Sequence, residues 1–204
     1  MKFICIGRNY VDHAREPGNS VPAPPVIFLK PETALLGGGK QFCTPTWSND
    51  VHHEIELVLR INREGKDIAV DDAHLHFDEV SVGIDFTARD VQSELKAKGH
   101  PWERAKAFDG SAVVGRFVKL AELNTPIDDL RFQLSKNEEI VQHGHTADII
   151  FPVGALISEI SSVMTLKSGD LVFTGTPAGV SAVNSSDMLE GSLEDRLLFS
   201  VTVQ

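Results

Sequence analysis

Cysteine is scarce in this sequence, and long hydrophobic runs are missing. Cys5 and Cys43 are the only cysteines among the 204 residues. Their spacing is not that of metal ligands, and it does not imply a disulfide. Both lie in apolar, strand-like stretches, so we expect two small buried hydrophobic side chains. No apolar run approaches the ~20 residues of a membrane span, and the apolar amino-terminal stretch is too short for a signal peptide. We therefore expect a cytoplasmic protein with no membrane partner.

Positive charge is the second shortage. The chain has 19 Lys and Arg against 29 Asp and Glu, a formal net charge of −10. A surface that follows nucleic-acid phosphates needs a basic stripe, so a nucleic-acid partner is not expected. Acidic ligands would need a local positive patch. Part of the carboxylate excess could belong to a metal site, where a cation would offset it.

The hydrophobic patterning predicts a mixed, β-rich α+β fold. Strand patterns dominate and helices are interspersed irregularly, which does not fit a regular βαβ winding. The length suits one domain over residues 1–204, with a few helices covering the sheets. Strand patterns occupy 2–6, 26–30, 53–61, 80–86, 112–118, 130–134, 140–143, 171–173 and 198–203, and helical patterns 10–16, 71–77, 88–98 (stopped by Gly99) and 152–163.

Residues 52–61 combine a strand pattern with two carboxylates. Apolar residues occupy every second position from Ile55 to Ile61, so Glu54 and Glu56 project together from the opposite face. Two neighbouring carboxylates repel each other unless positive charge lies between them. Such oxygen-rich sites suit Mg²⁺, Mn²⁺ or Ca²⁺. A solvated strand face would give the same pattern, so this pair alone leaves both interpretations open.

A third carboxylate, Asp85, favours the metal interpretation. It lies near the end of the strand pattern at 80–86, on the face opposite the apolar residues. Three carboxylates from two strand ends could form one face of an octahedral cation site. Of His52 and His53, which a strand points in opposite directions, at most one could bind with the glutamates. We expect one histidine to support the ligands and the other to pack or face solvent.

Three further features have a catalytic and a plain structural interpretation. His13 and Glu16 would be neighbours on a helix, where the carboxylate could make the imidazole a better base, although exposed pairs of this kind are common. Lys106 would be held near an anion if its surroundings are apolar, or it could be a surface lysine. The turn at residues 174–179 could bind a carboxylate through backbone amides, or it could only connect strands.

Taken together and in this order, the motifs resemble those of the fumarylacetoacetate hydrolase (FAH) family. The resemblance is closest to its short acylpyruvase-type members and covers roughly residues 2 to 180. Each motif alone is weak, whereas the full set is specific. The motifs are Gly7-Arg8-Asn9-Tyr10-x-x-His13-x-x-Glu16, Phe28-Leu29-Lys30-Pro31, His52-His53-Glu54-x-Glu56, Asp85-x-Thr87-Ala88-Arg89-Asp90-x-Gln92, Lys106-x-Phe108-Asp109, and Gly169-Asp170 followed by Thr174-Gly175-Thr176-Pro177-x-Gly179.

The resemblance implies the FAH-type C-terminal-domain fold, a β-roll or sandwich, usually as a homodimer with a divalent metal. Mg²⁺ or Mn²⁺ is implied and Ca²⁺ is possible, since the same oxygen ligands serve them. By position, the family's metal ligands correspond to Glu54, Glu56 and Asp85, and the dyad that activates water corresponds to His13 and Glu16. The family's lysine near the substrate oxygens corresponds to Lys106. Residues that line the substrate pocket correspond to Arg8, Gln92 and Thr176.

The implied reaction is cleavage of the carbon–carbon bond of 3-acylpyruvates, small keto acids, to pyruvate and a carboxylic acid through a metal-bound enolate. His13, oriented by Glu16, would take a proton from water, and Lys106 would stabilise the negative charge. Decarboxylation of oxaloacetate yields the same enolate, and isomerisation of 2-hydroxyhepta-2,4-diene-1,7-dioate proceeds through a metal-bound enol. A decarboxylase or a tautomerase of this kind on the same site is therefore the alternative. A non-catalytic metal-binding protein is a further class, but it would be expected to have lost one of these residues.

The carboxy-terminal segment departs from the family pattern. Relatives usually have a Gly-Asp turn followed by a long strand pair, and residues 184–191 read Asn-Ser-Ser-Asp-Met-Leu-Glu-Gly instead. This departure leaves the dimer surface and the local strand register open.

Overall fold

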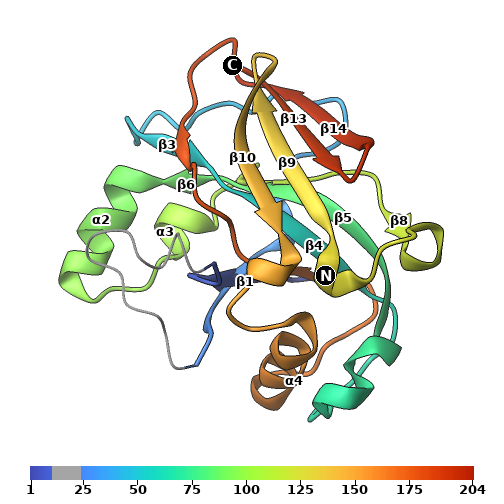
Figure 1. Ribbon diagram of the computed structural model, residues 1–204. Helices are drawn as coiled ribbons and strands as arrows, with labels where there is room; N and C mark the ends of the chain where they lie inside the picture. The colour runs from blue at the N-terminus through green and yellow to red at the C-terminus, as the bar shows by residue number, and fades with distance from the viewer. Residues whose placement is uncertain (11–23) are drawn as a thin grey trace.

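The computed structural model describes residues 1–10 and 24–204, and its largest sheet has seven strands (Figure 1). The order is β2-β1-β11-β4-β5-β7, with β8 also paired to β5. β1 and β11 are parallel, and the other neighbours are antiparallel. The strands are β1 (Phe3–Gly7), β2 (Val26–Lys30), β4 (Ile55–Ile61), β5 (Phe77–Asp85), β7 (Ala112–Val114), β8 (Val118–Lys119) and β11 (Leu171–Phe173).

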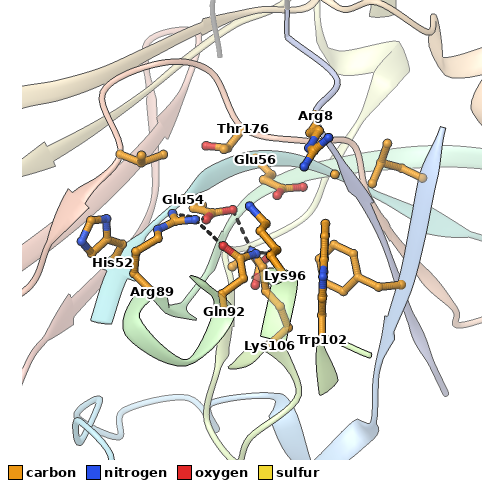
Figure 2. Close-up of a pocket in the computed structure, with 15 residues that line it drawn as sticks. Arg8, His52, Glu54, Glu56, Arg89, Gln92, Lys96, Trp102, Lys106 and Thr176 are labelled. Atoms are coloured by element: carbon orange, nitrogen blue, oxygen red, sulfur yellow. Dashed lines mark hydrogen bonds and ion pairs between the residues drawn. The ribbon is translucent and has the colours of Figure 1, made fainter. Parts of the chain in front are cut away.

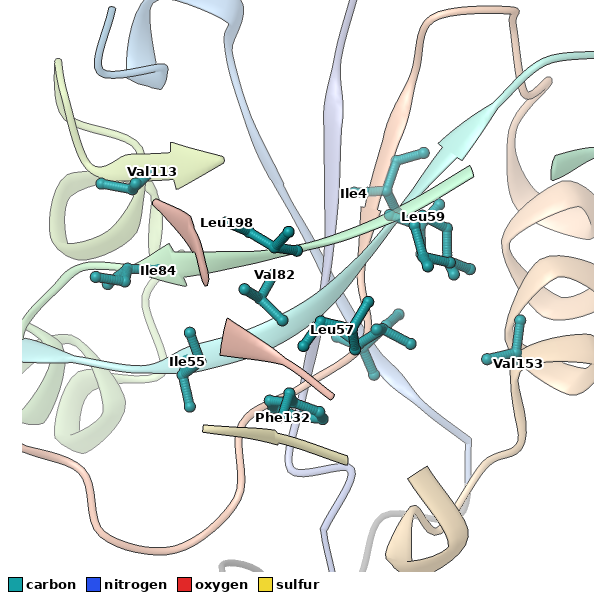
Figure 3. Close-up of a cluster of buried hydrophobic side chains, with 14 of the residues drawn as sticks. Ile4, Ile55, Leu57, Leu59, Val82, Ile84, Val113, Phe132, Val153 and Leu198 are labelled. Atoms are coloured by element: carbon teal, nitrogen blue, oxygen red, sulfur yellow. The ribbon is translucent and has the colours of Figure 1, made fainter. Parts of the chain in front are cut away.

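Two smaller sheets complete the strand structure of the described residues. A four-stranded antiparallel sheet, β10-β9-β13-β14, packs over β4 and β5, and a three-stranded sheet, β12-β3-β6, lies beside it. Figure 3 shows side chains of both larger sheets in one apolar cluster, including Leu57, Val82, Phe132 and Leu198. The strands are β9 (Arg131–Lys136), β10 (Glu139–His145), β13 (Met188–Leu193), β14 (Arg196–Thr202), β3 (Val51–His53), β6 (Thr87–Ala88) and β12 (Ser181–Ala182).

The helices are short and lie around the sheets. α2 and α3 pack together near β3 and β6, whereas α4 packs against η2 (Figure 1). α2 ends at Gly99, whose φ of 65° is a left-handed conformation that costs glycine little. No helix among the described residues is long and apolar enough to cross a membrane. The helices are α2 (Arg89–Lys98), α3 (Glu103–Lys106) and α4 (Val153–Val163), with 3₁₀ turns η1 (Glu32–Ala34), η2 (Val70–Leu75), η3 (Leu120–Glu122), η4 (Ile127–Asp129) and η5 (Thr146–Asp148).

The mixed, β-rich fold class is confirmed, and most elements lie where the patterns predict them. The strand expected at 53–61 begins earlier and is interrupted at Glu54, and the strand expected at 112–118 is divided into β7 and β8. The helical pattern at 10–16 extends beyond residue 10 into the part of the chain that the structure does not describe. The single domain and the homodimer stay predictions.

One cysteine expectation is wrong. Cys5 is buried in β1 and Cys43 is exposed, and both are free thiols. The isolated bridge from Phe42 to Val203 buries the phenylalanine, and in an extended segment the next side chain points the opposite way. Cys43 is therefore outward-facing, with its Sγ 3.3 Å from Gln204 Oε1.

The unusual carboxy-terminal segment still forms a strand pair. β13 and β14 are antiparallel from Met188 opposite Thr202 to Leu193 opposite Arg196, with a register shift between Gly191 and Ser192. The atypical residues before Met188 thus lie in the approach to the hairpin and leave the strand pair itself in place.

Candidate functional site

The candidate site begins where the chain passes between two sheets. Glu54 separates β3 from β4, and Asp85 is the last residue of β5. Ile55 lies opposite Ile84 in the β4–β5 register, which brings the adjoining Glu54 and Asp85 face to face. The Asp85 N–H donates to the Glu54 carbonyl at 2.9 Å. Strand pairing therefore brings together two carboxylates that are far apart in sequence.

The three predicted metal ligands lie together and are shielded from solvent. One carboxylate oxygen from each of Glu54, Glu56 and Asp85 lies within 4.8 Å of the others. Their exposed fractions are 5%, 1% and 0%, which excludes a solvated strand face. Lys106 of α3 and the Gly175 N–H contact Glu54 and Glu56, so other parts of the protein cover the side of the strand from which these carboxylates project.

Three basic side chains contact two of these carboxylates. Lys106 Nζ donates to Glu54 Oε2 at 2.9 Å and to Asp85 Oδ2 at 2.6 Å. Arg89 donates to Glu54 Oε1 at 2.5 Å, and Lys30 Nζ lies 2.6 Å from Asp85 Oδ1. Burial disfavours charge on Lys106, but Asp85 and Glu54 outweigh it and raise the pKa of the lysine. Lys106 therefore stays protonated and acts as a hydrogen-bond donor.

Lys30 forms an ion pair with Asp85 Oδ1 but makes its hydrogen bonds to other acceptors. Its ammonium group has three protons and four acceptors within reach: the Lys106 carbonyl, the carbonyl and hydroxyl oxygens of Ser111 at 3.0 Å each, and the Phe86 carbonyl at 3.4 Å. Asp85 Oδ1 is fully buried and accepts no hydrogen bond from the described residues. A lone pair of this oxygen is thus available to a cation in the cluster.

Glu56 is the carboxylate with the least compensation. The Gly175 N–H donates to its Oε2 at 2.7 Å, but no basic group of the described residues lies within 4.0 Å of it. Burial, then Asp85 and Glu54, raise the pKa of Glu56. A divalent cation among the three carboxylates would neutralise Glu56 and satisfy Asp85 Oδ1. The donor set, all carboxylate oxygens, fits Mg²⁺ or Mn²⁺.

The carboxylates line a cavity of about 320 Å³ (Figure 2). The predicted pocket residues Arg8, Gln92 and Thr176 all line it, as does Lys106. Arg89 donates to Gln92 Oε1 at 2.7 Å, which leaves the Gln92 amide nitrogen for a ligand. The structure thus brings together every predicted site residue that it describes. His13 and Glu16 lie outside the described residues, and their catalytic roles stay predictions.

The two histidines of the motif have different positions. His52 lines the cavity and pairs with Asp50, whereas His53 is buried behind it. His53 Nδ1 lies 2.8 Å from Gln142 Oε1, and Gln142 Nε2 donates to Thr176 Oγ1 at 3.0 Å. His53 thereby helps to position a cavity-lining hydroxyl through Gln142.

Four residues of the site have no role in the sequence-based prediction. Arg89, Lys96 and Trp102 line the cavity, whereas Lys30 is buried and pairs with Asp85. Lys30 and Arg89 do belong to the motifs that carry the family resemblance. A signal exists for Lys30, because it is the only charged residue of the apolar strand β2. Lys96 lies near the end of an ordinary polar helix face, and nothing in its surroundings distinguishes it from a surface lysine.

Comparison with known proteins gives matches over nearly the whole chain. The family model described as fumarylacetoacetate (FAA) hydrolase C-terminal matches residues 2–198. The mitochondrial oxaloacetate tautomerase FAHD1 of Rattus norvegicus is 40% identical over 192 residues, which cover 94% of this chain and 86% of that protein. The oxaloacetate tautomerase YcgM of Escherichia coli is 40% identical over 188 residues, with 92% and 86% coverage.

The fold similarity extends to a solved enzyme with a bound metal. The crystal structure of fumarylpyruvate hydrolase from Pseudomonas aeruginosa in complex with Mn²⁺ and pyruvate is 36% identical in sequence, with a TM-score of 0.92. The match covers 100% of this chain and 89% of that chain. Since the relatives include a mitochondrial and a bacterial protein, the cytoplasmic location stays a prediction.

Proposed function

The chain belongs to the fumarylacetoacetate hydrolase family, and on this premise we propose that it is a divalent-metal-dependent enzyme that acts on short 2-oxo acids through their enol forms. The first candidate reaction is keto–enol tautomerisation of oxaloacetate, the activity named for two relatives. One observation carries the proposal: the buried carboxylate of Glu56, with no basic partner among the described residues, at the end of a cavity with basic walls.

Glu54, Glu56 and Asp85 would hold the cation. When bound, a divalent ion supplies Lewis-acid stabilisation of the negative charge that develops on the 2-oxo oxygen during enolisation. Lys106, whose Nζ donates to Glu54 and Asp85, adds a hydrogen-bond donor beside the cation.

The remaining polar groups position the substrate. The Gln92 amide, fixed by Arg89, and the Thr176 hydroxyl, fixed by Gln142, are both aimed at the cavity and can hydrogen-bond carboxylate oxygens. We assign the proton transfer at the substrate's third carbon to His13, oriented by Glu16. This role rests on the family motif at these positions.

Hydrolysis of 3-acylpyruvates, with release of pyruvate, is the second candidate. It is favoured by the match to fumarylpyruvate hydrolase and by the His13-x-x-Glu16 motif. In this reaction the same histidine would take its proton from water, and the hydroxide would attack the distal carbonyl carbon. The two candidates differ in which proton the base removes, and they share the end of the cavity that holds the 2-oxo acid.

The test compares two products from two substrates. Loss of the ultraviolet absorbance of enol oxaloacetate reports tautomerisation, and pyruvate release reports cleavage of acetylpyruvate or decarboxylation of oxaloacetate. Each assay is run with Mg²⁺, with Mn²⁺ and with EDTA. Metal-dependent loss of enol without pyruvate supports the first candidate, and pyruvate from acetylpyruvate supports the second. Absence of all these activities would overturn the proposal for these substrates and leave longer diene-dioates to be tried.

Glu56→Gln tests the metal site itself, with exposed Glu64→Gln as the matched control. We expect the Glu56 variant to lose about 10²-fold or more of the activity, since an interaction worth several kcal/mol is removed. Thermal melting gives a second readout, because a ligand that binds the folded state raises Tm. Oxalate should raise the Tm of the wild type and of the control only when metal is present, and it should not raise that of Glu56→Gln.

A further inference from the structure

We propose that Lys96, together with Arg8, binds the distal carboxylate of a dicarboxylic 2-oxo acid and thereby makes the site select oxaloacetate over acylpyruvates with an uncharged tail. This inference rests on the proposed function, because it assumes that the 2-oxo acid end lies at the Glu54, Glu56 and Asp85 carboxylates.

Lys96 is held over the cavity by its own helix and by an aromatic ring. It lies near the end of α2, lines the cavity, and its Nζ is 5.3 Å from the centre of the Trp102 ring. A cation over the face of an indole is attracted to the ring, so the side chain of Lys96, although exposed to solvent, is directed toward the cavity that it lines. Figure 2 shows the amine of Lys96 reaching into the cavity toward Arg8.

Arg8 occupies the facing wall with an unsatisfied donor. Its Nε is buried and has no hydrogen-bond partner among the described residues. Its φ of 60° is left-handed, a conformation that costs a non-glycine residue about 1 kcal/mol or more. The backbone strain and the buried N–H are both compatible with a ligand oxygen as the missing partner.

The two cations repel each other and have no ion-pair partner among the described residues, since no carboxylate there lies within 4.0 Å of Lys96 or Arg8. Burial, followed by repulsion from Arg8 and Arg89, lowers the pKa of Lys96, and the more distant Glu54 opposes this shift. An anion between Lys96 and Arg8 would relieve this repulsion and satisfy the Arg8 donor. Arg89 is already engaged by Glu54 and Gln92, which leaves Lys96 and Arg8 for the ligand.

The two candidate substrates differ at the end that faces these cations. Oxaloacetate and acetylpyruvate share the carboxylate, the 2-oxo group and the next carbon, and then have a second carboxylate and an acetyl group, respectively. A pair of cations favours the charged group over the neutral one, since charge-assisted hydrogen bonds are about twice as strong as neutral ones. Lys96 is thus a specificity residue, whereas the site of Glu54, Glu56 and Asp85 holds the 2-oxo acid part that both substrates share.

The test compares Lys96→Met with Lys98→Met, which removes an exposed lysine from the same turn of the same helix. We expect Lys96→Met to lower kcat/KM for oxaloacetate by about 10- to 100-fold, the effect of one hydrogen bond between charged groups, and to change that for acetylpyruvate less than about threefold. Lys96→Arg should recover most of the loss, and Lys98→Met should retain both activities.

A binding experiment separates this inference from the proposed reaction. Malate and 2-hydroxybutyrate differ only by a distal carboxylate in place of a methyl group, and neither needs to be turned over. In the presence of Mn²⁺, malate should raise the Tm of the wild type more than 2-hydroxybutyrate does, and Lys96→Met should abolish the difference. Equal effects of Lys96→Met on both ligands and both substrates, or no effect on any, would overturn the inference. A wild type that binds malate selectively but turns over neither substrate would overturn the proposed reaction alone.

Discussion

Acidification should destabilise this protein through one buried histidine, His53. The ring has no exposed surface, and its two nitrogens each lie 2.8 Å from a partner, Gln142 Oε1 and Ser181 Oγ. Gln142 Oε1 also accepts from the Ile55 N–H, so Nδ1 carries the imidazole proton and Nε2 accepts from the serine hydroxyl. Burial lowers the pKa of His53 to about 4, opposed by the Gln142 hydrogen bond and assisted by the Lys136 cation.

The magnitude follows from the difference between the folded and unfolded states. The folded pKa of about 4 lies below the ordinary value of 6.5, so between these values the unfolded chain binds the proton that the folded chain refuses. The contribution of His53 to stability is therefore fully present above pH 6.5 and is lost as the pH falls toward 4. Between pH 7 and pH 5 the loss amounts to about 2 kcal/mol.

Urea unfolding at pH 7 and at pH 5, with EDTA and constant salt, measures this loss. The wild type should lose about 2 kcal/mol more than His53→Gln between the two pH values, whatever the variant costs at pH 7. Lys136→Met, which removes the cation that also lowers the pKa of His53, should show an intermediate pH dependence. Equal pH dependence in the wild type and His53→Gln would refute the account of His53 as a neutral buried base.

Two further stability predictions concern buried lysine and aspartate contacts. Lys30→Met should lower the free energy of unfolding by about 1–3 kcal/mol, because the buried Asp85 carboxylate loses one of its two basic partners and keeps Lys106. An unchanged free energy of unfolding in urea would contradict the assignment. Asp170 accepts from the backbone and side chain of Lys2, and these bonds hold its pKa below the ordinary 3.8 although burial opposes them. The contribution of Asp170 to stability is present above pH 3.8 and is lost below it. Asp170→Asn should therefore lower the free energy of unfolding by about 1–3 kcal/mol at pH 7, and this difference from the wild type should shrink in acid. A difference that stays constant between pH 7 and pH 3 would contradict this.

The strands that form the site were predictable because side chains alternate. The apolar residues from Ile55 to Ile61 and from Val80 to Ile84 identify two buried strand faces, and the face of each carboxylate follows from a period of two. The same pattern could not decide between a solvated and a buried face. That choice depends on residues distant in sequence, such as Lys106 of α3 and Gly175, which contact Glu54 and Glu56 from the other side.

The basic residues around the site were less predictable than the acidic ones. Lys30 reaches Asp85 from β2, and Lys96 reaches the cavity from α2, yet neither position has a periodic signal. A lysine has a long apolar stem, so the same sequence position can place its amine in water or over a buried group. Cys43 is a second residue whose burial the sequence does not predict. Phe42 and Cys43 point in opposite directions, and the bridge from Phe42 to the carboxy-terminal strand shows which of the two faces inward.

Net charge and site charge have opposite signs in this molecule, and the difference bears on function. The chain has a formal charge of −10, which argues against a nucleic-acid partner. With this net charge, an acidic ligand can bind only where positive side chains gather locally. The cavity supplies that patch with Arg8, Arg89, Lys96 and Lys106 around its walls. Two of these cations, Arg89 and Lys106, are already engaged by the carboxylates at one end, and a metal ion there would hold the 2-oxo acid end of a substrate. The uncommitted cations then lie where the second charge of a dicarboxylate would bind, which is why the arrangement favours oxaloacetate.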